Sequence, residues 1–142
     1  MKPNLIAKVE VSINAPVDKV WEALTNPVLI KEYLFGTEVV TDWKVGSPII
    51  WKGVWQGKNY EDKGKIIGLV PEKLLETTYW SGLSGITDIP ENYKKVTYEL
   101  VEMGVSTKLT LTQDNNKTEE DKRHSEQNWK MVLDGLKKLL EK

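Results

Sequence analysis

The chain contains one histidine, His124, and no cysteine, so few of its side chains belong to the types that usually carry catalysis or bind transition metals. A histidine–cysteine metal site is excluded, because such sites need several of these ligands. A general base needs an imidazole that is held by a partner and partly buried. On a helical wheel, His124 lies about 140° from the apolar stripe of its predicted helix, so it should face solvent. We therefore expect no catalytic role for His124 and no metal site.

Carboxylates are abundant, but their positions do not indicate an acid–base pair. Glu61 and Asp62 are adjacent in a predicted strand, so their side chains point to opposite faces, and we expect both to be solvated. No nucleophile motif is present, and the glycines between residues 53 and 68 do not precede a helix, as those of a phosphate-binding loop would. We therefore predict no catalytic residue and no cofactor. An enzyme would need a buried carboxylate or tyrosine pair that faces a cavity.

The aromatic side chains are more informative, with six Trp and five Tyr against one Phe. Trp51 and Trp55 are four residues apart in a predicted strand, so they point to the same face of the sheet. Together with Tyr98 and Trp129, they would form the wall of an apolar pocket. The alternative is a packed core, which is the more common use of aromatic residues at this spacing.

The last stretch of the chain, residues 118–142, predicts a long amphipathic helix. Its apolar residues fall on one stripe at helical spacing, namely Trp129, Val132, Leu133, Leu136 and Leu140. Ser125 and Lys122 continue this line toward the N-terminus, so the inward face has an apolar half and a polar half. Either the helix projects past the sheet there, or the polar residues line the mouth of a cavity, with Leu133 in its wall. Thr118 and Asp121 resemble a capping box.

The remaining segments predict one strand, two short helices and a meander of six strands. The first strand spans residues 5–14, and Asn14 could cap a helix over residues 16–24, followed by a helix over 28–33. The six strands are expected at residues 38–41, 48–56, 60–70, 74–80, 93–101 and 105–113, with loops at 81–92 and 114–117. Gly64 and Gly68 suggest a bulge. Tyr79 and Trp80 cannot both face inward, and these glycines leave the choice open.

Composition limits the class of protein. At 142 residues, the chain is expected to form one domain over residues 1–142. The net charge of −1 does not suggest nucleic acid as a partner. No apolar run approaches the roughly 20 residues of a membrane span, and the N-terminus lacks the apolar core of a signal peptide. The absence of cysteine fits a reducing compartment, so we expect a cytoplasmic location.

Several segments, taken in order, resemble one known family. The segment VSINAPVDKVWEALTNP at residues 11–27 resembles the opening of the family homologous to the activator of the heat-shock-protein-ninety ATPase. Further similarity lies in DWKVG at 42–46, GKIIGLVP at 64–71, VTYEL at 96–100, TKLTL at 107–111 and WKMVLDGL at 129–136. The family glycine before the helix tryptophan is Asn128 here, and we expect this departure to narrow the close packing over the sheet.

This family belongs to the START-like, birch-pollen-allergen-like (SRPBCC) superfamily, and the resemblance implies an α+β helix-grip fold. In that fold a curved antiparallel sheet, in β-α-α-β6-α order, wraps around a long C-terminal helix and encloses a cavity. Superfamily members bind lipids, sterols or polyketides, and some are enzymes. The chaperone-activating protein resembles this chain in one domain only and has a second, N-terminal domain.

Three functions follow as hypotheses. The leading one is a small cytosolic binding protein that holds a hydrophobic or amphipathic small molecule or lipid between the sheet and the C-terminal helix. Its walls would be Trp51, Trp55, Tyr98, Trp129 and Leu133, with Ser125 and Lys122 as polar contacts near the mouth. The second is a chaperone-regulating interaction module, by analogy with the family. The third, also by analogy with the superfamily, is a cyclase-like or hydrolase-like enzyme, which would need the buried pair mentioned above.

Overall fold

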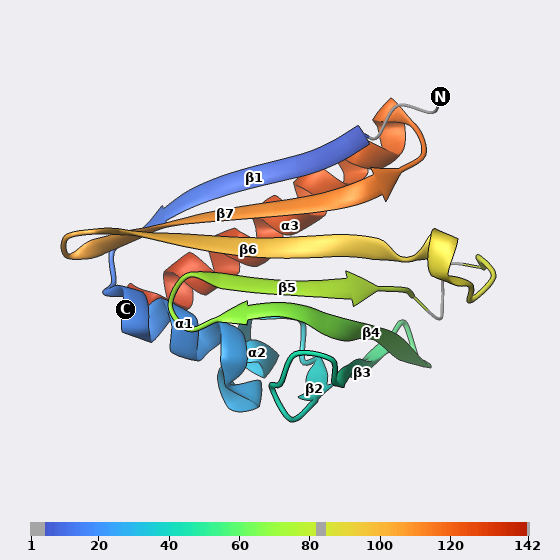
Figure 1. The fold of residues 1–142 in the computed structure, drawn as a ribbon, viewed down its shortest axis with the longest axis horizontal. Helices are drawn as coiled ribbons and strands as arrows, with labels where there is room; N and C mark the ends of the chain where they lie inside the picture. Colours follow the sequence, from blue (N-terminus) through green and yellow to red (C-terminus); the bar gives the residue numbers. More distant parts are fainter. Residues whose placement is uncertain (1–4, 82–84, 142) are drawn as a thin grey trace.

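A computed structural model describes residues 5–81 and 85–141 of the chain. The elements follow the predicted β-α-α-β6-α order (Figure 1). Their bounds are β1 Leu5–Ile13, α1 Val17–Thr25, α2 Pro27–Tyr33, β2 Glu38–Val40, β3 Pro48–Trp55, β4 Lys58–Val70, β5 Leu74–Tyr79, β6 Lys94–Met103, β7 Ser106–Asn116 and α3 Glu119–Leu140, with a short 3-10 turn at Pro90–Asn92. The predicted α+β class with a long C-terminal helix is therefore confirmed.

The strands form one seven-stranded sheet in the order β1-β7-β6-β5-β4-β3-β2, and each neighbouring pair is antiparallel. Strands β2 to β7 make the expected meander, because each strand pairs with the next one along the chain. The first strand, β1, pairs with the last strand, β7, and so forms one edge of the sheet, while β2 forms the other. The suspected bulge is present, since the pairing of β4 with β5 shifts register between Ile66 and Gly68.

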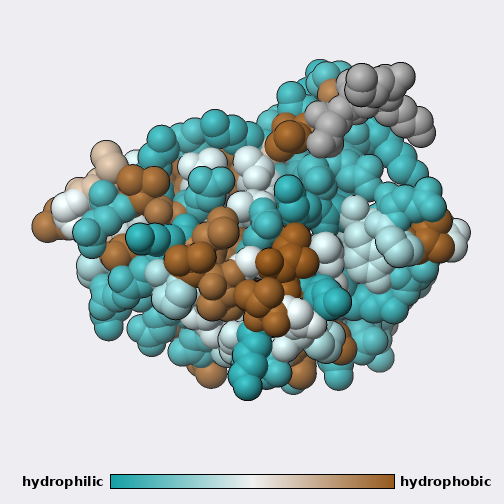
Figure 2. All heavy atoms as spheres, in the orientation of Figure 1, coloured by the Kyte–Doolittle hydropathy of each residue, from teal (hydrophilic) through white to brown (hydrophobic). Residues whose placement is uncertain are grey.

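Helix α3 packs on one face of this sheet, and Figure 1 shows it crossing behind β1, β7 and β6. Its stripe is buried as predicted at Val132, Leu133 and Leu136. Leu133 and Leu136 belong to a core cluster that includes side chains of β7 and α1. The helix begins where expected, because the Thr118 hydroxyl accepts a hydrogen bond from the Asp121 amide at 3.0 Å. On the face of the sheet that is turned away from α3, exposed apolar groups gather near the middle (Figure 2). The exposed apolar residues of β4 include Ile67 and Val70, which are about half exposed.

Two local predictions were wrong. Asn14 does not cap α1; Pro16 occupies the N-cap position without a side-chain hydrogen bond. The cap belongs instead to α2, where the Asn26 side chain accepts from the Val28 amide at 3.0 Å. The polar segment 114–117 is not a loop throughout, because β7 continues to Asn116. These polar residues extend the strand because Asn116 pairs with Leu5 of β1. A pairing with a distant strand cannot be seen in the local sequence pattern.

Within the described residues, no helix is long and apolar enough to cross a membrane. In the same part of the chain, no group of three or more histidine, cysteine or acidic residues is arranged to hold a metal ion.

Replacing Gly64 or Gly135 by alanine is expected to change the free energy of unfolding in opposite directions. A Cβ at Gly64 would collide with the backbone carbonyl of Thr78 on the neighbouring strand, whereas a Cβ at Gly135 of α3 would meet Tyr33 at 3.7 Å, an ordinary contact. We expect Gly64→Ala to lower the free energy of unfolding by more than about 2 kcal/mol. Gly135→Ala should raise it by about 0.5–1 kcal/mol, because alanine favours the helix. Urea unfolding followed by circular dichroism measures both, and equal effects would contradict the described packing.

Candidate functional site

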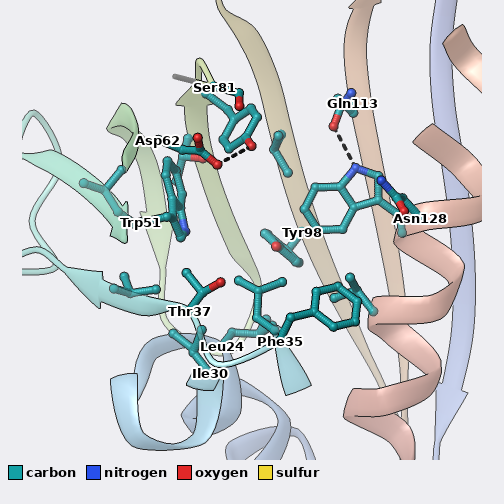
Figure 3. A pocket seen from close by; sticks show the side chains of 18 of the residues that line it. Leu24, Ile30, Phe35, Thr37, Trp51, Asp62, Ser81, Tyr98, Gln113 and Asn128 are labelled. Atoms are coloured by element: carbon teal, nitrogen blue, oxygen red, sulfur yellow. Dashed lines mark hydrogen bonds between the residues drawn. The ribbon is translucent and has the colours of Figure 1, made fainter. Parts of the chain in front are cut away.

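A cavity of about 490 Å³ lies between the concave face of the sheet, α3 and the two short helices (Figure 3). It is large enough for a small organic ligand. One end, here called the apolar end, is lined by Leu24, Ile30, Leu34 and Phe35, which come from α1, α2 and the segment that follows. The other, here called the polar end, includes Asp62, Tyr79, Ser81, Lys94 and Gln113. Figure 3 shows Asp62, Ser81 and Gln113 on the side opposite Leu24 and Ile30.

The polar end contains a buried carboxylate that the sequence analysis placed in solvent. Asp62 is only 8% exposed and lines the cavity, so the expectation that it is solvated was wrong. The Tyr79 hydroxyl donates a hydrogen bond of 2.7 Å to Asp62 Oδ2. Burial first, and then the charge of Asp62, raise the pKa of Tyr79 far above its usual value. The phenol therefore remains a neutral donor beside the carboxylate.

The local register explains how Asp62 and Tyr79 meet. Gly64 carries no side chain on the inward row of β4, and there the Thr78 hydroxyl of β5 accepts a hydrogen bond from the Lys65 amide at 2.9 Å. Tyr79 thereby faces the cavity, whereas Trp80 stacks on Tyr93 with ring centroids 6.5 Å apart. This settles the choice that the sequence left open.

Aromatic rings surround the carboxylate. Trp51 of β3 is the direct strand partner of Asp62, and its ring meets the Tyr79 ring edge-on at 5.3 Å between centroids. Tyr60 also lines the cavity, where its hydroxyl shares a hydrogen bond of 2.6 Å with Thr37. Three aromatic residues of the cavity wall therefore come from the strand positions closest to Asp62 or bond to it.

A chain of hydrogen bonds joins α3 to the sheet at the same end. Trp129 Nε1 donates to Gln113 Oε1 at 2.7 Å, and Gln113 Nε2 donates to the Ser125 hydroxyl at 3.1 Å. Ser125 in turn donates to Asn116 Oδ1 at 3.1 Å, and Asn116 Nδ2 donates to the Leu5 carbonyl of β1 at 2.9 Å. The polar half of the helix face is therefore bonded to β7 and β1 and does not project beyond the sheet.

Tyr98 stands in the cavity wall with its ring perpendicular to that of Trp129, at 6.2 Å between centroids and an interplanar angle of 89°. Burial raises the pKa of its phenol well above the usual value. Within the described part of the chain, no hydrogen bond of the Tyr98 hydroxyl is found. This hydroxyl can therefore donate to an acceptor on a ligand.

The residues proposed from the sequence are distributed as follows. Trp51, Tyr98, Ser125 and Trp129 line one cavity. Leu133 does not; it is fully buried in the core with α1, one helical turn beyond Trp129. Lys122 is half-buried on α3 but is not a lining residue. The side chain of Trp55 lies outside the part of the structure that is described.

Sequence reasoning missed several residues of the site. Lys94 of β6, rather than Lys122, is the lysine that lines the cavity, and its amine approaches Asn116 Oδ1 at 3.5 Å. Asn128, where the family has glycine, is another lining residue. His124 is exposed, as its wheel position predicted. The strand periodicity around Asp62 was the one sequence signal for the missed carboxylate, since it shares the inward alternation of Tyr60 and Ile66.

Comparison with known proteins identifies one family. Residues 14–141 match the family model described as Activator of Hsp90 ATPase homolog 1-like protein. The search of curated proteins gives no match.

Solved structures with the same fold are numerous. The solution structure of ChR145 from Cytophaga hutchinsonii has 54% identity and a TM-score of 0.87, over 99% of this chain and 97% of that one. The crystal structure of MLL2253 from Mesorhizobium loti has 25% identity and a TM-score of 0.72, over 96% of each chain. The Aha1 dimer from Colwellia psychrerythraea, at 21% identity and a TM-score of 0.73 over 95% of each chain, shares the fold.

Gln113 tests whether the hydrogen-bond chain holds α3 in place. Gln113→Met keeps the side-chain length but removes both bonds, which leaves the Trp129 N–H without its partner. We expect the free energy of unfolding to fall by about 1–3 kcal/mol. The control is Gln127→Met, which changes an exposed glutamine of α3. It should alter the free energy of unfolding by less than about 0.5 kcal/mol. Equal effects of the two substitutions in urea unfolding would show that the hydrogen bonds of Gln113 do not contribute to stability.

Proposed function

The chain belongs to the Activator of Hsp90 ATPase homolog 1-like family, and from this premise we propose that it is a binding protein for a small hydrophobic or amphipathic molecule. The ligand, which could be a lipid, lies between the sheet and α3. The observation that carries this proposal is the cavity of about 490 Å³, with an apolar end and a polar end. We also propose that residues 1–142 form a single START-like domain, of which the family match covers 14–141.

The chemistry of the cavity wall supports an amphipathic ligand. Apolar side chains of α1 and α2 would take its hydrophobic body, and burial of that body would contribute roughly 25 cal/mol for each Å² removed from water. The Tyr98 hydroxyl and the Asp62–Tyr79 pair would orient its polar atoms. Such a division between apolar area and a few polar groups is typical of small-molecule sites.

The buried Asp62–Tyr79 pair meets the condition set for an enzyme, but its chemistry favours binding. An efficient general acid has a pKa near the ambient pH. Burial and the Asp62 charge move the pKa of Tyr79 in the opposite direction. A phenol in this state holds a hydrogen bond rather than transferring its proton, so the pair is better suited to orienting a ligand.

A chaperone-regulating function is the second candidate, favoured by the description of the family as homologous to an activator of the Hsp90 ATPase. Here the protein would bind a chaperone through its surface and raise the rate of ATP hydrolysis. Addition of this chain to the purified chaperone, with the ATPase rate and co-precipitation as readouts, distinguishes the two. No binding and an unchanged rate would exclude this candidate.

The cavity is tested by filling it. Val132 of α3 lines the cavity, and Val101 of β6 is half exposed and is not a lining residue. With the neutral fluorescent probe N-phenylnaphthylamine, we expect saturable binding to the wild type and a loss of at least about tenfold in affinity for Val132→Trp, because the indole would occupy ligand volume. Val101→Trp should bind like the wild type. Absence of saturable binding to the wild type, or equal loss in both variants, would contradict the proposal.

A further inference from the structure

We propose that the cavity binds an amphipathic molecule that carries a carboxylate on an apolar body, and that Lys94 is the residue that receives this carboxylate. The inference rests on the proposed binding function and specifies the chemical class of the ligand. Its geometric basis is the half-buried side chain of Lys94 on β6, which lines a cavity with a mostly apolar wall. Among the described lining residues, Lys94 is the one cation.

The first argument is that the protein pairs the Lys94 ammonium group only weakly. Its amine donates a hydrogen bond to Asn116 Oδ1 at the long distance of 3.5 Å, and this oxygen also accepts from Ser125. Within the described part of the chain, Lys94 forms no ion pair. An ammonium group has three donors, and a carboxylate would supply both an acceptor and the opposite charge.

The second argument is the balance of charges around Lys94. Burial lowers the pKa of Lys94, and the positive charge of Lys117 adds to this effect. The charges of Asp121 and Asp114 act in the opposite direction, but the net shift is downward, so they do not compensate the burial. Neither acid lines the cavity, because Asp121 is exposed and Asp114 accepts a hydrogen bond from the Lys95 amide at 2.6 Å. A ligand carboxylate would provide the missing negative charge from the cavity side.

The third argument is the inward row of β6, which extends the site along the cavity. Lys94, Val96 and Tyr98 occupy alternate positions of this strand, and all three line the cavity. Figure 3 shows Tyr98 between Gln113 at the polar end and Leu24 at the apolar end. The row therefore presents an ammonium group, an apolar side chain and a phenol whose hydroxyl can donate. Both polar groups are donors, so they complement the oxygens of an acid better than the ammonium group of an amine.

The other charge in the cavity wall is compatible with a carboxylate at Lys94. Asp62 lies on β4, and β5 separates it from β6. Tyr79 of β5 pairs with Lys94 across the strands and donates its hydroxyl to Asp62. The charge of Asp62 is not among those that act on Lys94. One lysine matches the single charge of a carboxylate better than a phosphate monoester, which carries about −1.5 to −2 at neutral pH.

The experiment compares three ligands that share a phenylbutyl body: phenylbutyrate, phenylbutanol and phenylbutylamine. Calorimetric titration at neutral pH should give an affinity for the acid that is about tenfold or more above those for the alcohol and the amine, as expected for a hydrogen bond between charged groups. Lys94→Met keeps most of the side-chain length but removes the charge. It should abolish the preference for the acid and leave the alcohol affinity within about threefold.

Two further variants control for the net charge of the protein. Lys95 is the next residue on β6 and is exposed on the opposite face of the sheet. Lys95→Met therefore changes the net charge by the same amount and should retain the preference for the acid. Lys94→Arg should also retain a preference for the acid, because the guanidinium group keeps the positive charge.

A second measurement does not depend on a variant. In the wild-type protein, nuclear Overhauser effects should connect the methylene next to the carboxylate of phenylbutyrate with the methyl protons of Val96, the inward neighbour of Lys94 on β6. Contact of Val96 with the phenyl ring alone would overturn the inference, because the ligand would then lie in the opposite orientation.

The affinities can also overturn the inference. Equal affinity for the three ligands, tighter binding of the amine, an acid preference that survives Lys94→Met, or its loss in Lys95→Met would each do so. Binding of N-phenylnaphthylamine without a preference for the acid would overturn the inference and leave the proposed binding function in place. Failure of all four compounds to bind would overturn both.

Discussion

The structure depends on where the apolar stripe of α3 meets the sheet. The C-terminal half of the helix is packed tightly, because Leu133 and Leu136 are fully buried against β7 and α1. The N-terminal half, from Ser125 to Trp129, borders the cavity instead. A single rigid helix can satisfy both conditions only when the sheet curves away beneath it. The cavity is therefore a consequence of one helix packing at one end, and it does not need a separate structural device.

The hydrogen bonds from Gln113 and Asn116 keep the open half of α3 from moving. Because the cavity takes the place of part of the apolar packing at that end, the helix needs a further attachment. Trp129 and Ser125 provide it through hydrogen bonds to polar groups of β7. The Asn116 bond to the Leu5 carbonyl extends the attachment to β1. Because buried polar groups must be paired, this chain of bonds also fixes the indole of Trp129 against Tyr98. The shape of the cavity wall is thereby specified.

Most of the architecture was predictable from the sequence, because it depends on local periodicity. The stripe of α3, the strand alternation and the Thr118 cap each act within a few residues of the chain. The site was predictable only in part, because it depends on contacts between strands. Asp62 was misassigned since alternation gives two faces without saying which is buried, and Leu133 was placed in the cavity since no local signal shows that α1 covers it.

The hydrogen bond between Asp62 and Tyr79 joins elements that are already connected, unlike the hydrogen bonds of Gln113. The hydrogen bonds of Gln113 join elements that would otherwise separate, but the Asp62–Tyr79 bond joins β4 and β5, which the backbone already connects. Lys63 and Trp80, the next residue on each strand, exchange hydrogen bonds of 3.0 and 2.8 Å. Replacement of a buried charged group by an apolar one of similar volume is often neutral or stabilising. The Asp62–Tyr79 bond therefore adds little to the joining of β4 and β5, and its position in the cavity wall is consistent with the proposed binding of a ligand that carries polar atoms.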